Sequence, residues 1–314
     1  MNTDRYNRLW PQVLIELLSY DGYIMQIQQM GIDKMDNFEK IKMFSPNGDH
    51  YNFWIPCYFN EDHFSRSFQL VTNSISVIRK GITGSIENDF RPEMVLAVLP
   101  CLINKTIVFI LNGTIYHSLA AIQAYCHLLR LYYSLIQRFP ALQVKITSDV
   151  EKFKASSNNR DKKIFPDLGE FIINLFFSNT KYDEIKQSLF IEFMCRQIFW
   201  IEKKQRLDSI QTGVFMQKVF EHSKIANHLL MFNIMAARYF ISNERINQLD
   251  QNFGFIPDEL MSQFKGVILR IKNVSSYEDF FNCVQINDFR SEIEFKKMVY
   301  DCKKNALSKG YISY

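Results

Sequence analysis

Glycine and proline are scarce in this chain: its 314 residues include 11 glycines and 8 prolines, about half the share usual in soluble proteins. Because tight turns between strands depend on these two residues, their scarcity argues against a turn-rich all-β fold and favours long helices. Paired cysteines are also missing, since the six cysteines are widely spaced and form no C-x-x-C motif. In a chain of this length, such cysteines predict reduced, mostly buried thiols in an intracellular, cytoplasmic protein.

An excess of one charge is missing as well, because 37 basic residues accompany 33 acidic ones. This balance does not by itself indicate binding to nucleic acid or to a membrane surface. The longest apolar run, residues 94–111, contains Pro100 and the polar trio Asn104-Lys105-Thr106. Neither part reaches the ~20 residues that cross a bilayer, so we expect no membrane span and two buried helices that meet at a turn. The N-terminus lacks the apolar core of a signal peptide.

Apolar residues at helical spacing are abundant in the rest of the chain. Phe64, Phe68, Val71, Ile75 and Ile78 form one continuous helical face, and similar patterns recur along the sequence. The spacing predicts further helices at residues 115–135, 142–153, 182–204 and 212–242, and in the C-terminal segment. Good helix N-caps precede several of these patterns, namely Asn60, Asp167, Ser276 and Asp288.

The first 59 residues have a mixed pattern. Residues 13–27 are apolar with a helical period, which predicts a helix. Residues 51–56, in contrast, end in Ile55-Pro56. Because the residue before a proline avoids the α region, we expect residues 51–56 to be extended. The sequence therefore predicts an all-α fold, an irregular α-solenoid or orthogonal helical bundle with a short extended N-terminal arm. We expect an N-terminal segment at 1–59, a main helical domain at 60–242 and a C-terminal helical subdomain at 243–314 packed on it.

Motifs that carry chemistry are missing from the sequence. There is no G-x-x-x-x-G-K-[ST], G-x-G-x-x-G, G-x-S-x-G or H-E-x-x-H pattern, so the sequence predicts no catalytic residue, no cofactor and no metal site. One faint motif is Pro46-Asn47-Gly48 followed by Cys57, which resembles the turn before the nucleophile of ubiquitin-conjugating enzymes. Ser45 stands where that family has histidine. A cysteine-dependent enzyme with Cys57 as nucleophile is therefore the alternative hypothesis.

Two groups of residues are candidates for binding a partner. The first is the aromatic arm with Phe53 and Trp54, together with His63 in the first turn of the following helix, because exposed tryptophan and tyrosine are favoured binding anchors. The second is the densest basic cluster, with Arg160, Lys162 and Lys163. An RNA-associated helical protein that uses this cluster is a further alternative. Aromatic stacking partners are not interleaved with the cluster, so the support for binding nucleic acid is weak.

A set of short segments from about residue 50 to the end forms landmarks in the sequence: Ile55-Pro56, Asn60-Glu61-Asp62-His63-Phe64, Phe90-Arg91-Pro92-Glu93-Met94, Pro166-Asp167-Leu168-Gly169-Glu170, Arg196-Gln197-Ile198-Phe199-Trp200, Leu229-Leu230-Met231-Phe232-Asn233 and Ser308-Lys309-Gly310-Tyr311. With these landmarks, the chain resembles a helical module found in large multidomain proteins of protists. The resemblance implies no catalytic residue, and it implies an association with ubiquitin-system domains.

Taken together, these observations favour a non-enzymatic protein-interaction module. We expect a protein partner, bound through the aromatic arm or through a groove between helices. An adaptor role in ubiquitin signalling is the context that the resemblance implies.

Overall fold

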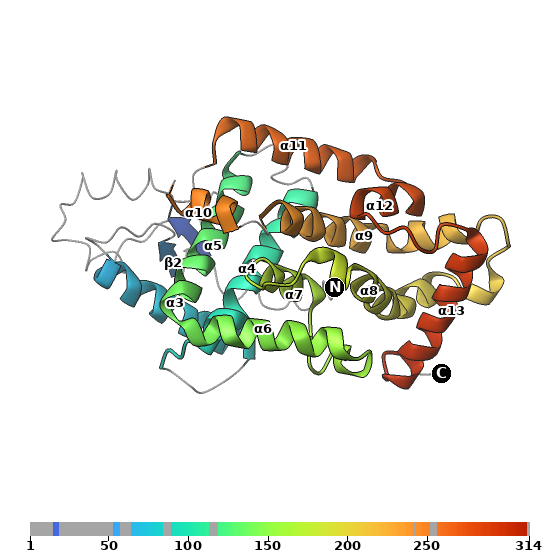
Figure 1. Cartoon of the computed structure of the whole chain (residues 1–314), viewed down its shortest axis with the longest axis horizontal. Helices are drawn as coiled ribbons and strands as arrows, with labels where there is room; N and C mark the ends of the chain where they lie inside the picture. The colour runs from blue at the N-terminus through green and yellow to red at the C-terminus, as the bar shows by residue number, and fades with distance from the viewer. Residues whose placement is uncertain are drawn as a thin grey trace, which may run out of the picture. The chain divides into compact units, whose positions relative to one another are not determined.

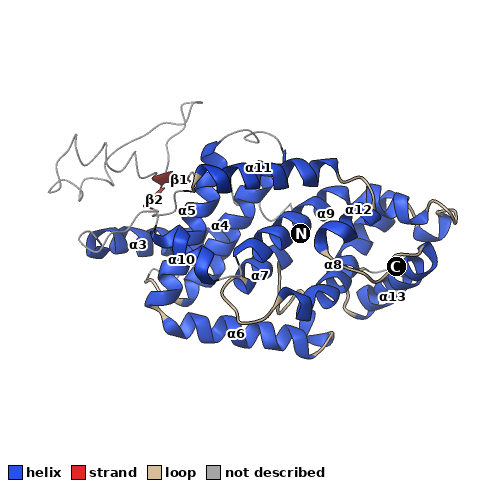
Figure 2. Ribbon diagram, turned by 45° about the horizontal axis from the view of Figure 1, so that its top comes forward, coloured by secondary structure: helices blue, strands red, loops and turns tan. Residues whose placement is uncertain are grey.

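The structure, a computed structural model, describes residues 15–18, 53–56, 64–83, 89–112, 119–240, 243–251 and 256–312. Within these residues the fold is all-α, as the sequence predicts (Figures 1 and 2). Two short 3-10 helices, η3 (Asn158–Arg160) and η4 (Leu207–Ser209), lie in the described loops. The α-helices are α3 (Phe64–Thr83), α4 (Glu93–Asn112), α5 (Leu119–Arg138), α6 (Pro140–Ala155), α7 (Leu168–Leu175), α8 (Tyr182–Lys204), α9 (Phe215–Phe240), α10 (Asn243–Gln251), α11 (Asp258–Asn273), α12 (Tyr277–Val284) and α13 (Glu292–Ser308).

Strands β1 (Ile15–Leu18) and β2 (Phe53–Pro56) pair in parallel, with Ile15 opposite Phe53. The extended conformation predicted for residues 53–56 is confirmed. The helix predicted over residues 13–27 is wrong at residues 15–18, because a short apolar run fits a strand as well as a helix and periodicity alone cannot separate the two. Asn60 and Cys57 lie outside the described residues.

Helix α4 corrects a second prediction, because it passes through Pro100 without a turn. A proline inside a helix costs about 3 kcal/mol. Around it, however, α4 buries Val98, Leu99, Leu102 and Ile103, and burial of one large apolar side chain contributes about 1.5–3 kcal/mol. Packing of the helix therefore outweighs the missing backbone hydrogen bond.

The helix caps show where sequence signals work. Asp167 accepts hydrogen bonds from the backbone N–H groups of Gly169 and Glu170 at 2.7 and 3.1 Å, and Ser276 caps α12 in the same way, so both predictions are confirmed. The cap predicted at Asp288 is wrong, because α13 begins after Ser291. Phe289 has φ +62°, a left-handed conformation that a helix cannot continue through.

The chain divides into two compact units, residues 2–143 with 244–258, and residues 144–243 with 259–314. This division differs from the predicted segments 1–59, 60–242 and 243–314. Its cause lies in α10, which binds α5 far away in the sequence. Arg130 Nε lies 2.8 Å from Asp250 Oδ1, and Tyr133 Oη donates to Asn247 Oδ1 at 2.7 Å.

The first unit, residues 2–143 with 244–258, is built around the contact between α4 and α5, with α3 against α4. Its core is aliphatic along α4, whereas α5 also buries Tyr125 and Tyr132 completely. At one end, three rings pack together: Phe68, Phe90 and Phe139, with centroids 5.9–6.4 Å apart. The guanidinium of Arg138 lies 4.8 Å from the Phe68 ring centroid and shields this apolar end.

The second unit, residues 144–243 with 259–314, is built around α8 and α9. Helix α8 packs against α9 and α13, and α9 packs against α7 and α12 (Figure 1). Residues 192–198 of α8 are buried on every side. Aromatic rings fill the space between these helices. The ring centroid of Phe190 lies 5.2–6.2 Å from the ring centroids of Tyr277, Phe280 and Phe281. This unit contains the sites described next.

Candidate functional site

The basic cluster predicted to bind a partner lies between α6 and α7, and Arg160 is part of its framework. Arg160 Nε donates to the carbonyl of Phe153 at 2.9 Å, and the guanidinium lies 5.3 Å from the Phe153 ring centroid. The Phe153 carbonyl belongs to the last turn of α6, whose carbonyl groups have no partner within the helix. Arg160 therefore caps α6, and its own carbonyl accepts from Arg196 at 2.8 Å. Burial lowers the pKa of Arg160.

Lys162 and Lys163 are both exposed, but their surroundings differ. The ammonium of Lys162 lies 4.6 Å from the Tyr311 ring centroid, and its backbone N–H donates to Tyr311 Oη at 3.0 Å. Although the residue as a whole is exposed, desolvation of its ammonium and the nearby Arg196 lower the pKa of Lys162. The backbone of Lys163 donates to Asp161 Oδ1 at 2.7 Å. Of the three predicted residues, Lys163 is thus the one whose side chain has no role in the described framework.

Beside this cluster, α8 holds a buried carboxylate, Glu192, with 2% of its surface exposed. Glu192 Oε1 accepts from Arg196 Nε at 2.8 Å and from Tyr311 Oη at 2.9 Å, and Oε2 accepts from Lys309 Nζ at 2.5 Å. Sequence reasoning did not find this cluster, because its members come from distant segments. Gly310 makes the contact possible: at φ +67° it turns the chain after α13, so that Tyr311 reaches back to α8.

The cysteines in the described residues are buried: Cys101, Cys126, Cys195, Cys283 and Cys302. Burial raises the pKa of Cys126. A hydrogen bond with Cys195, followed by burial, raises the pKa of Cys302. A nucleophilic cysteine needs the opposite environment, one that favours the thiolate. Cys57, the nucleophile of the alternative hypothesis, lies outside the described residues.

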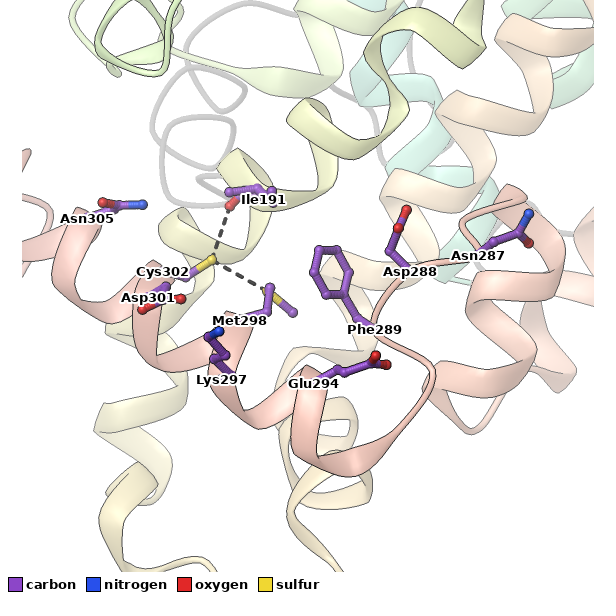
Figure 3. A pocket seen from close by; sticks show the side chains of 10 residues that line it. All are labelled: Ile191, Asn287, Asp288, Phe289, Glu294, Lys297, Met298, Asp301, Cys302 and Asn305. Atoms are coloured by element: carbon purple, nitrogen blue, oxygen red, sulfur yellow. Dashed lines mark hydrogen bonds between the residues drawn. The ribbon is translucent and has the colours of Figure 1, made fainter.

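A cavity of about 500 Å³ opens between α8 and α13 (Figure 3). Its floor is apolar, and three carboxylates and one ammonium surround it. The thiol of Cys302 donates to the carbonyl of Ile191 at 3.6 Å and lies 3.6 Å from Met298 Sδ. The cavity therefore holds no activated nucleophile. It is lined by Ile191, Asn287, Asp288, Phe289, Glu294, Lys297, Met298, Asp301, Cys302 and Asn305.

The most informative exposed feature is an aromatic pair near the end of α8. Phe199 and Trp200 are 41% and 38% exposed, and their rings meet edge to face with centroids 5.0 Å apart and planes at 82°. Lys203 Nζ lies 5.6 Å from the Trp200 ring centroid. We call Phe199, Trp200 and Lys203 the α8 surface. Single exposed apolar side chains are common on protein surfaces, but apolar side chains that lie together, as these two rings do, can mark a binding site.

The apolar periodicity of α8 contains a signal for the α8 surface, because the two aromatic residues lie off the buried face. Ile198 and Ile201 are buried and continue the apolar face of α8, whereas Phe199 and Trp200 project from the other side of the helix. Apolar residues that lie off the buried face of a predicted helix are candidates for a binding surface. The two aromatic residues entered the sequence analysis only as a landmark of the resemblance.

The structure does not test the binding residues predicted in the N-terminal arm. Phe53 and Trp54 belong to β2, but their side chains, and the whole of His63, lie outside what the structure describes. Their role in partner binding stays a prediction.

No group of three or more His, Cys, Asp or Glu side chains in the described residues could hold a metal ion. Among the described helices, none has the length and apolar character needed to cross a membrane. No family model matches the chain, and no curated protein and no solved structure matches it either.

Proposed function

We propose that this chain is a non-enzymatic protein-interaction module that binds its partner through the α8 surface. The observation that carries the proposal is the exposed pair Phe199 and Trp200, held rigidly on a helix whose preceding turns are buried on all sides. Tryptophan is among the residues that dominate interface energies, because its large ring buries much area and loses little conformational entropy. A rigid helix also limits the entropy lost on binding.

The environment of the thiols supports a binding role over an enzymatic one. Each described cysteine is buried, and the pKa values of Cys126 and Cys302 are raised. The alternative that depends on Cys57 finds no supporting observation in the described residues. The RNA hypothesis is not favoured either, because Arg160 and Lys162 are engaged with Phe153 and Tyr311. The ubiquitin-system context remains an expectation from the resemblance alone.

Capture of a partner from cell lysate tests the proposal. The bait is the wild-type chain, and the test variant is Phe199→Ala with Trp200→Ala. A matched control removes two exposed apolar side chains elsewhere, Leu269→Ala with Ile293→Ala, which are 53% and 82% exposed. We expect one stoichiometric protein that binds the wild type and the control but not the test variant.

A third bait, Phe53→Ala with Trp54→Ala, separates the two aromatic candidates. If this bait loses the partner while the α8 variant keeps it, the arm is the binding surface and the proposed site is wrong. If no bait captures a stoichiometric protein, the interaction function itself is refuted. Circular dichroism of each variant checks that the helices are intact.

A further inference from the structure

Exposed cations outnumber carboxylates in the chain segment next to the aromatic pair. Lys203, Lys204 and Arg206 are exposed at the end of α8 and just after it. The acidic residue among them, Glu202, is bound by Lys303, whose Nζ lies 2.7 Å from Glu202 Oε1, and the Glu202 side chain is only 20% exposed. The chain that directly follows Phe199 and Trp200 therefore presents more exposed positive charge than negative charge.

The next carboxylate along the chain, Asp208, also contacts α13, although its side chain is 64% exposed. Asp208 accepts a hydrogen bond from Tyr300 Oη at 2.9 Å, and Lys303 Nζ lies 3.4 Å from Asp208 Oδ2. These two contacts lower the pKa of Asp208 and hold its charge against α13. Lys303 of α13 thus contacts both carboxylates but balances the charge of only one of them. With Lys203, Lys204 and Arg206 included, four cations accompany two carboxylates, so the net charge of this segment and its partner lysine is positive.

The helix dipole explains only part of this arrangement. Lys203 and Lys204 lie in the last turn of α8, where cations stabilise the helix. Lys204 Nζ also donates to the carbonyl of His222 at 2.8 Å. Neither effect requires two exposed aromatic rings beside the cations, and Arg206 lies beyond the helix.

Aromatic rings next to cations also suit single-stranded nucleic acid, so the ring geometry decides between the two classes of partner. A base stacks on an open, parallel aromatic face. Here the rings of Phe199 and Trp200 stand at 82° to each other, and Lys203 lies over Trp200. This edge-to-face pair offers a corner for an apolar side chain and no flat platform for consecutive bases. The geometry therefore favours a protein.

We propose that the partner docks on the α8 surface through an acidic segment that carries one large apolar side chain. The apolar side chain packs in the corner between Phe199 and Trp200, and the flanking carboxylates meet Lys203 and Arg206. This inference rests on the proposed function and specifies the chemical character of the partner's binding segment. Complementary charges around an apolar anchor set specificity and the rate of association.

Selection from a random-peptide library on the immobilised full chain tests the inference. The Phe199→Ala, Trp200→Ala variant serves for counter-selection. We expect the enriched peptides to share a leucine, phenylalanine or tryptophan flanked by aspartate or glutamate. If the enriched peptides depend on the aromatic pair but are neutral or basic, the inference fails and the proposed function stands. If no peptide depends on the pair, both fail.

Charge reversal then tests the electrostatic part on the selected peptide, labelled with fluorescein and followed by fluorescence anisotropy. We expect Lys203→Glu with Arg206→Glu to weaken binding by about tenfold or more, and added salt to weaken the wild-type complex. Lys163→Glu, an exposed lysine at another place, is the control and should leave the affinity unchanged. Equal affinities for the double variant and the wild type would overturn the inference.

Two further probes examine other occupants of this surface. A fluorescein-labelled oligouridine that binds the wild type but not the charge-reversed variant would show that the surface takes RNA, and would refute the acidic segment. Sedimentation of the wild type and the aromatic variant measures self-association. A dimer that the aromatic variant loses would assign the surface to a second copy and refute the inference.

Discussion

Replacing Glu192 with glutamine should destabilise the second unit far more than replacing an exposed carboxylate. The side chain of Glu192 is 2% exposed and binds Arg196, Lys309 and Tyr311. Glutamine keeps the size and one acceptor oxygen, but it removes the negative charge and turns an N–H₂ group toward a donor. Arg196 and Lys309, whose side chains are 3% and 10% exposed, are then left without their anion.

The magnitude follows from this burial. Removing one partner of a buried ion pair costs about 3–5 kcal/mol, because the remaining charge stays desolvated and uncompensated. Lys145 and Asp149 provide the matched control, an i,i+4 pair on α6 whose side chains are 56% and 29% exposed. Asp149→Asn should cost about 0.3–0.5 kcal/mol, as is typical of exposed helix pairs.

Urea unfolding followed by circular dichroism measures both effects, with the free-energy differences taken from the midpoints at a common slope. A second variant, Glu192→Gln with Lys309→Met, removes the stranded ammonium as well. It should be more stable than the sum of the two single changes predicts, by about 0.5–3 kcal/mol. If Glu192→Gln costs no more than Asp149→Asn, the buried cluster does not stabilise the fold and this reasoning is wrong.

Three further predictions concern protonation, thiol reactivity and capping. Burial lowers the pKa of His228 from 6.5, although its hydrogen bond to the Val274 carbonyl opposes the shift. Its contribution to stability is therefore complete above about pH 6.5 and is lost as the pH falls through the lower folded-state value. His228→Gln should reduce the fall in Tm between about pH 7.5 and about pH 5.5, and an unchanged fall would contradict this. Cys126 and Cys302, with raised pKa values, should react slowly with iodoacetamide at neutral pH and rapidly in urea, as mass spectrometry of the alkylated peptides can show; fast labelling of the native chain would be the contrary result. Asp167→Ala should cost about 1 kcal/mol through loss of the α7 cap, and a variant as stable as the wild type in urea would argue against it.

The elements that sequence analysis predicted well are those whose signals are local. Helix α8 begins and ends where its apolar spacing does, and Asp167 and Ser276 cap helices because a side-chain oxygen near free N–H groups needs no distant partner. Where tertiary burial competes with a local signal, the local signal fails. Pro100 lies inside α4 because the surrounding apolar residues are buried on several sides.

The candidate site was harder to predict than the fold, since exposure depends on what the rest of the chain covers. The sequence shows that Phe199 and Trp200 lie off the apolar face of α8, but it cannot show that no other helix covers them. The cluster around Glu192 was missed for a related reason. A buried ion pair requires the convergence of α8 with the chain after α13, and separation in sequence conceals that convergence.

The basic cluster shows how neighbouring residues of one charge can have different roles. Arg160 binds the terminal carbonyl groups of α6 and stacks on Phe153, whereas Lys163 is exposed. A hydrogen bond from a charged donor contributes about 1.5–3 kcal/mol, so Arg160→Ala should cost about that much, and Lys163→Ala should change stability by less than about 0.5 kcal/mol. Arg160→Lys should recover only part of the loss, because an ammonium cannot reproduce the planar guanidinium on the ring. Urea unfolding of the three variants measures the differences. Equal stabilities for Arg160→Ala and Lys163→Ala would mean that Arg160 is not a cap, and its charge would again be available to a partner.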